Sequence, residues 1–80
     1  MEIENGDVFW SDTEKASCLV LYSDTSFDWG TEYKVVYVSK NSDALTFYRM
    51  TWIPENLLRS QWKRAGHIDI SLLTELARNH

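Results

Sequence analysis

The chain has few of the residues that are abundant in disulfide-rich or disordered small proteins. Its 80 residues include one cysteine, one proline and three glycines. A lone cysteine excludes a disulfide within the chain, and so few prolines and glycines are untypical of a disordered linker. No apolar run approaches the roughly 20 residues of a membrane-spanning helix. Residues 1–4 (MEIE) carry no apolar signal-peptide core. We therefore expect a cytoplasmic protein that does not enter a membrane.

Aromatic side chains are what the chain has in quantity. It contains four tryptophans, four tyrosines and three phenylalanines. Each can bury roughly 150–250 Å² of surface, so a few of them can build a core. Eighty residues are near the lower limit for a core-driven domain. We therefore expect a single domain over residues 1–80, and dimerisation is compatible with a core this small.

Charge is divided unevenly along the chain, whose net charge is −4. Residues 1–44 hold nine acids against three lysines, and residues 45–80 hold three acids against five cations. Nucleic-acid binding depends on neutralising phosphates, which an acidic body does poorly. An acidic surface favours a protein partner with a basic surface instead.

Apolar periodicity divides the chain into strands followed by helices. The pattern predicts four strands, at residues 7–10, 17–22, 33–39 and 44–50, and a short fifth strand at residues 51–53. The turn formers at 40–43 predict a hairpin. Pro54 and Gly66 delimit a predicted helix at 54–65, and Asp69 is positioned to cap a second at 70–79.

The expected architecture is therefore α+β. We predict a small SH3-like barrel, or a bent antiparallel sheet of four to five strands, followed by two C-terminal helices. The predicted core residues are Val8, Trp10, Leu19, Leu21, Val36, Val38, Phe47, Leu58, Trp62, Leu73 and Leu76.

The N-terminal half resembles the MazF-like toxin ribonucleases. The similarity lies in residues 6–12 (GDVFWSD), 18–24 (CLVLYSD) and 33–39 (YKVVYVS). It implies an SH3-like barrel in a family that cleaves RNA as dimers. The family's catalytic arginine, just before the second strand, has no counterpart in residues 14–17 (EKAS), and Ser39 alone falls near its catalytic threonine. The resemblance therefore implies the barrel without the nuclease.

The second half resembles small phage and prophage proteins. The similarity lies in the hairpin and in the aromatic, basic segment 52–64 (WIPENLLRSQWKR). It implies a phage-encoded protein that acts inside a bacterial host.

The candidate binding site is the aperiodic segment from Asp24 to Glu32. Phe27 and Trp29 are the predicted anchors for a partner, and the acids Asp24, Asp28 and Glu32 are the predicted polar rim. In the alternative interpretation, both aromatics fold back and close one end of the barrel. The acids do not form an EF-hand, because the required glycine and bidentate glutamate are missing.

Arg59, Lys63 and Arg64 form a second candidate surface, for nucleic acid, with Trp62 available for base stacking. Cys18 lies in an apolar run, which predicts that its thiol is buried. The sequence has no catalytic triad, phosphate-binding loop or metal-ligand spacing, so we predict no enzyme, metal or cofactor. The leading hypothesis is a non-enzymatic protein-binding module, a phage or prophage protein that binds and modulates a bacterial host or defence protein. The alternative is a nucleic-acid-associated SH3-like protein, a degenerate MazF-like barrel.

Overall fold

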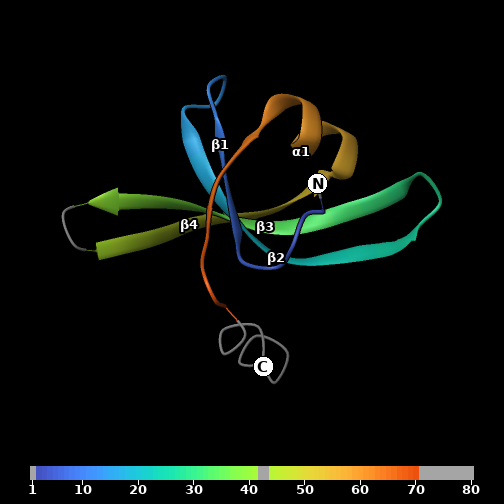
Figure 1. The fold of residues 1–80 in the computed structure, drawn as a ribbon, viewed down its shortest axis with the longest axis horizontal. Helices are drawn as coiled ribbons and strands as arrows, with labels where there is room; N and C mark the ends of the chain where they lie inside the picture. Colours follow the sequence, from blue (N-terminus) through green and yellow to red (C-terminus); the bar gives the residue numbers. More distant parts are fainter. Residues whose placement is uncertain (1, 42–43, 71–80) are drawn as a thin grey trace.

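Five strands and one short helix follow one another in the computed structural model, which describes residues 2–41 and 44–70. The strands form one antiparallel sheet of order β4-β3-β2-β1-β5 (Figure 1). The elements are β1 (Asp7–Ser11), β2 (Ala16–Phe27), β3 (Gly30–Asn41), β4 (Ala44–Pro54), α1 (Glu55–Gln61) and β5 (Lys63–His67).

The prediction of an SH3-like barrel or bent sheet followed by two C-terminal helices is wrong. The described residues form a five-stranded sheet with a single seven-residue helix, which lies between β4 and β5 rather than after the sheet. No helix in the described part of the chain is long and apolar enough to cross a membrane. Residues 71–79 of the second predicted helix lie outside the described residues.

Pairing with β1 explains why the first predicted helix ends early. The backbone of Trp62 is extended, with φ −120° and ψ 148°, and the next residues pair with β1, Lys63 opposite Trp10 and Arg64 opposite Phe9. Strand β1 would otherwise leave its backbone N–H and C=O groups unpaired along one edge. The fifth predicted strand, 51–53, is instead the end of β4, because β3 continues to pair as far as Pro54.

The main core lies on the face of the sheet that α1 covers. Its residues alternate along the strands, since successive side chains point to opposite faces. Leu58 is the buried residue of α1, and Trp62 packs edge-on against Tyr37 with ring centroids 5.7 Å apart. The buried cluster consists of Phe9, Ala16, Cys18, Val20, Tyr33, Val35, Tyr37, Ile53, Leu58 and Trp62.

The opposite face carries a smaller cluster of Leu19, Val36 and Ile70, with Val8, Leu21 and Val38 packed against it. Most of the predicted core residues in the strands belong to this face. Two of them are not core residues, because Trp10 is 36% exposed and Phe47 is 49% exposed. The alternation correctly separates the two faces, but it does not say which face the helix covers.

Candidate protein-binding site

The predicted binding segment, Asp24 to Glu32, is the end of a β-hairpin rather than an aperiodic loop. Strand β2 continues to Phe27 and β3 begins at Gly30, with Asp24 opposite Glu32 and Phe27 opposite Gly30. The φ of Gly30 is +122°, a value that a residue with a side chain rarely adopts. Figure 1 shows the turn at the right-hand end of the sheet, where blue-green changes to green.

A row of aromatic rings runs from the hairpin tip onto β4. Trp29 stacks on Phe27 with centroids 4.8 Å apart and planes 23° apart. Phe27 meets Trp52 edge-on at 6.0 Å, and Trp52 meets Tyr22 edge-on at 5.6 Å. The ammonium group of Lys34 lies 5.1 Å from the centre of the Trp52 ring, which adds a cation–π contact. The row ends in Trp29, whose side chain is 70% exposed.

The three predicted acids take different positions around this tip. Glu32 is buried beside Trp29 and accepts a hydrogen bond of 2.7 Å from the indole N–H. Asp24 accepts bonds from the hydroxyl and the backbone N–H of Ser26, and these bonds hold the pKa of Asp24 below its ordinary value. Asp28 is exposed at the turn. Glu32 therefore orients Trp29, while Asp24 and Asp28 supply the outward negative charge.

A hollow of about 430 Å³ lies beside Trp29, between the hairpin tip and the start of α1. The register that places Glu32 opposite Pro54 brings these two segments together. Sequence reasoning missed the contribution of β4 and α1, because it treated the tip as a free loop. The hollow is lined by Trp29, Gly30, Thr31, Glu32, Pro54, Glu55 and Asn56.

The three cations predicted to touch nucleic acid are not gathered into one patch. Arg59 lies on α1, whereas Lys63 and Arg64 are neighbours on β5, so their side chains leave opposite faces of that strand. Each is paired with an acid: Arg59 with Glu55 at 3.0 Å, Lys63 with Asp12 at 3.7 Å, and Arg64 with Asp7 at 3.2 Å.

Two groups with reactive chemistry are held in structural roles. Cys18 is fully buried, and burial raises the pKa of its thiol to about 12, so it carries little thiolate at neutral pH. The buried carboxylate of Asp7 accepts hydrogen bonds from the backbone N–H of Glu4 and from Arg64, and it lies 2.8 Å from Nδ1 of His67. Glu4, Asp7 and His67 are close enough to hold a metal ion, but Asp7 already has these partners.

Comparison with protein-family models, with curated proteins and with solved structures gave no match to this chain.

Proposed function

We propose that the protein is a non-enzymatic protein-binding module whose hairpin tip contacts a partner with a basic surface. The observation that carries the proposal is the state of Trp29, an exposed indole held in one orientation by the Phe27 ring and the Glu32 carboxylate. Tryptophan is enriched among the residues that dominate binding energy, and fixing it before binding lowers the entropy lost on association.

Charge supports a basic partner. Asp24 and Asp28 lie at the tip, and residues 1–44 carry most of the acids of the chain. Complementary charge around an apolar centre speeds association and excludes partners of the wrong sign. We place the protein in the cytoplasm, whose reducing environment fits the free thiol of Cys18. On the resemblance of its second half alone, we propose a bacterial host or defence protein as the partner of a phage-encoded chain.

The first experiment compares proteins captured from bacterial lysate by the unmodified chain, by Trp29→Ala and by Trp10→Ala. Trp10 is the matched control, a partly exposed tryptophan whose indole N–H also donates to a carboxylate, that of Asp12. A partner of the hairpin tip is retained by Trp10→Ala and lost by Trp29→Ala. If every captured protein is retained equally by both variants, the proposal is wrong.

The second experiment measures affinity with the purified partner. Trp29→Ala should weaken binding roughly thirtyfold, the effect of removing about 2 kcal/mol at an anchor. Its melting temperature should stay close to that of the unmodified chain, because a largely exposed ring contributes little burial. Asp28→Lys should mainly slow association and change its salt dependence. A large fall in melting temperature in Trp29→Ala would instead make Trp29 a structural residue.

Nucleic acid is tested in the same preparation. Salt-sensitive RNA or DNA binding that disappears in the double variant Arg59→Ala, Lys63→Ala, but persists in Trp29→Ala, would replace the protein-binding proposal.

A further inference from the structure

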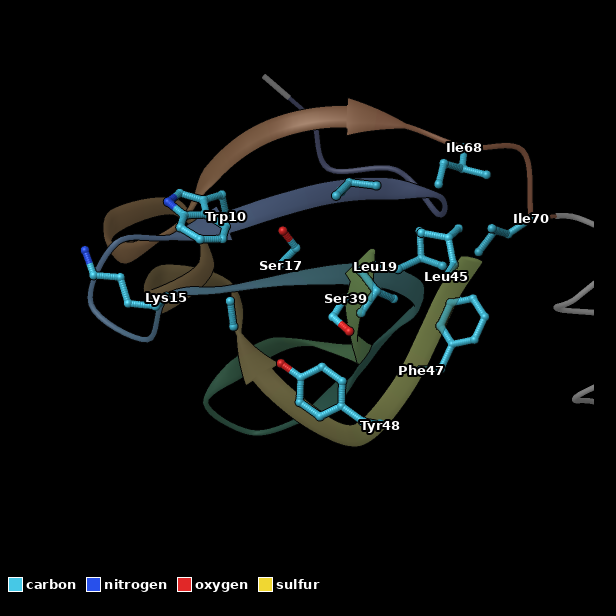
Figure 2. A pocket seen from close by; sticks show the side chains of 13 residues that line it. Trp10, Lys15, Ser17, Leu19, Ser39, Leu45, Phe47, Tyr48, Ile68 and Ile70 are labelled. Carbon is cyan, nitrogen blue, oxygen red and sulfur yellow. The ribbon is translucent and has the colours of Figure 1, made fainter. Parts of the chain in front are cut away.

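The hollow beside Trp29 is lined differently from the groove on the face of the sheet opposite α1. That groove, of about 440 Å³, is lined mainly by apolar side chains, and Lys15 is its one charged lining residue (Figure 2). The hollow beside Trp29, of about 430 Å³, is lined by two carboxylates, Glu32 and Glu55, and by no cation. Its chemistry therefore suits a positively charged ligand.

Glu32 presents an unpaired carboxylate oxygen to this hollow. The residue is only 8% exposed, and its Oε2 atom accepts the hydrogen bond from the indole N–H of Trp29. Among the described residues, its Oε1 atom has no hydrogen-bond partner. No buried side-chain oxygen of these residues lacks a partner, so Oε1 must be reached by solvent. Because Glu32 is a lining residue, the solvent that reaches Oε1 is that of the hollow.

Asp7 shows what a buried carboxylate normally requires in this fold. Asp7 and Glu32 are the two buried acids of the described residues. Asp7 lies 3.2 Å from Arg64 and 2.8 Å from His67, because a buried charge is costly unless it is paired. Glu32 has only the neutral indole donor, and it lies opposite Asp24, where like charges destabilise a strand pair. A cation in the hollow would supply the missing partner.

The other walls of the hollow suit the flat guanidinium group of an arginine. Phe27 covers one face of the Trp29 ring, which leaves the other face of this exposed side chain open. A guanidinium group stacks on an indole face and donates through a planar fork of N–H groups. In Glu55, Arg59 and Tyr33 engage only Oε2. A spread of donors suits two free oxygens that come from different elements, whereas a lysine ammonium is a compact point charge.

We infer that the hollow binds an arginine side chain of the partner, with the guanidinium group stacked on Trp29 and hydrogen-bonded to Glu32. The inference rests on the proposed function, because it names the chemical group by which the hairpin tip recognises its basic partner. Asp24 and Asp28, which lie at the tip, add attraction at longer range.

Titration of the full chain with two short peptides tests the inference without the partner. The probes are acetyl-Gly-Arg-Gly-amide and the same peptide with citrulline, which has the shape of arginine but no charge. The signal is the indole N–H resonance of Trp29, identified as the one that is missing in Trp29→Ala. The arginine peptide should shift this resonance saturably, and the citrulline peptide should not. Equal shifts with both peptides, or no shift with either, would overturn the inference.

Glu32→Gln tests the role of the buried carboxylate. Glutamine keeps a carbonyl oxygen for the indole N–H of Trp29, but the negative charge is removed. The arginine peptide should bind at least about tenfold more weakly, because a hydrogen bond to a charged group is lost. The control, Glu4→Gln, removes the same charge from an exposed residue that does not line the hollow, and it should bind like the unmodified chain. Equal binding by the two variants would contradict the inference.

Capture from bacterial lysate separates this inference from the proposed function. A protein that is lost by Trp29→Ala but retained by Glu32→Gln would show that the hairpin tip binds its partner without an arginine in the hollow, which overturns the inference alone. Peptide binding that requires Glu32, in a chain whose captured proteins are all retained by Trp29→Ala, would contradict the proposed function and support the preference of the hollow for arginine.

Discussion

Among single residues, Asp7 shows how a small sheet accommodates a buried charge. Its side chain is fully buried, yet both carboxylate oxygens have partners in Glu4, Arg64 and His67. Burial by itself would raise the pKa of Asp7, but these hydrogen bonds outweigh it and hold the pKa below its ordinary value of 3.8. Asp7 therefore links the start of β1 to β5 as a carboxylate rather than as a neutral acid.

Replacing Asp7 with asparagine should lower the free energy of unfolding at pH 7 by about 1–3 kcal/mol, because a buried network loses a charged acceptor. The depressed pKa means that the carboxylate stabilises the fold above pH 3.8, and that this contribution is lost as the pH falls through its folded pKa. The stability of Asp7→Asn should therefore depend less on pH in this acidic range. Urea unfolding across the range measures both effects. Asp12→Asn, in an exposed pair with Lys63, is the control and should change stability by less than about 1 kcal/mol. Parallel acid curves for Asp7→Asn and the unmodified chain would contradict this account.

At the scale of elements, the strands with strong side-chain signals are the ones that the sequence predicts. The segments 7–10, 17–22, 33–39 and 44–50 all lie within β1 to β4, because β-branched and aromatic residues alternate there. Strand β5 (KRAGH) has neither kind of residue and is mostly exposed. Strand β5 forms because it pairs with the edge of β1 that β2 does not cover. The cause of this strand therefore lies in residues 7–11 and not in its own sequence.

The candidate site was predictable in part for the same reason. Phe27 and Trp29 stand out in the sequence as aromatics among acids, and the structure brings them together. The contribution of Trp52 depends on the register of β3 with β4. That register shifts by an irregularity between Tyr37 and Val38, so counting back from the turn does not place Trp52 opposite Lys34. Local patterns do not report such a bulge.

The turn before β1 gives a prediction at this scale. Gly6 has a φ of +98°, accepts a hydrogen bond from the N–H of Ile68 and donates one to the carbonyl of Val20. A Cβ at Gly6 would overlap the carbonyl oxygen of Ile68, so Gly6→Ala combines backbone strain with a clash against main chain. We expect a loss of at least about 2 kcal/mol, measured by urea unfolding. Gly66→Ala is the control, because the space around Gly66 is open. Similar losses in the two variants would show that Gly6 is not under this constraint.

Across the whole molecule, the uneven charge of the sequence is partly resolved by strand pairing. Strand β5 brings Lys63 and Arg64 beside Asp12 and Asp7, so cations of the second half meet acids of the first. Exposed pairs such as Lys63 with Asp12 add little stability. Their effect is to place an acid beside each of these two cations, which is one reason why the partner we propose is a basic protein rather than nucleic acid.

The whole fold should also be sensitive to alkali, because its main core contains buried ionisable groups, among them the thiol of Cys18 and the phenol of Tyr37. Burial raises the pKa of Cys18 to about 12, and burial together with the hydrogen bond to Glu14 raises the pKa of Tyr37 above its ordinary value of 10.0. A raised folded pKa means that stability is complete below the unfolded value, 9.0 for the thiol and 10.0 for the phenol, and is lost as the pH rises towards the folded value.

We therefore expect the free energy of unfolding to fall above pH 9, by up to about 1.4 kcal/mol per pH unit for each buried group that ionises in the unfolded chain. Tyr37→Phe removes one such group. It should lower stability at pH 7, where its hydrogen bond to Glu14 is lost, and it should make the decline above pH 10 shallower. Tyr48→Phe, which changes a largely exposed ring of β4, is the control and should leave the slope as it is. Urea unfolding at a series of pH values between about 7 and 11 measures the slopes. A decline in Tyr37→Phe as steep as that of the unmodified chain would mean that Tyr37 ionises as readily in the fold as outside it, and that its bond to Glu14 does not hold the proton.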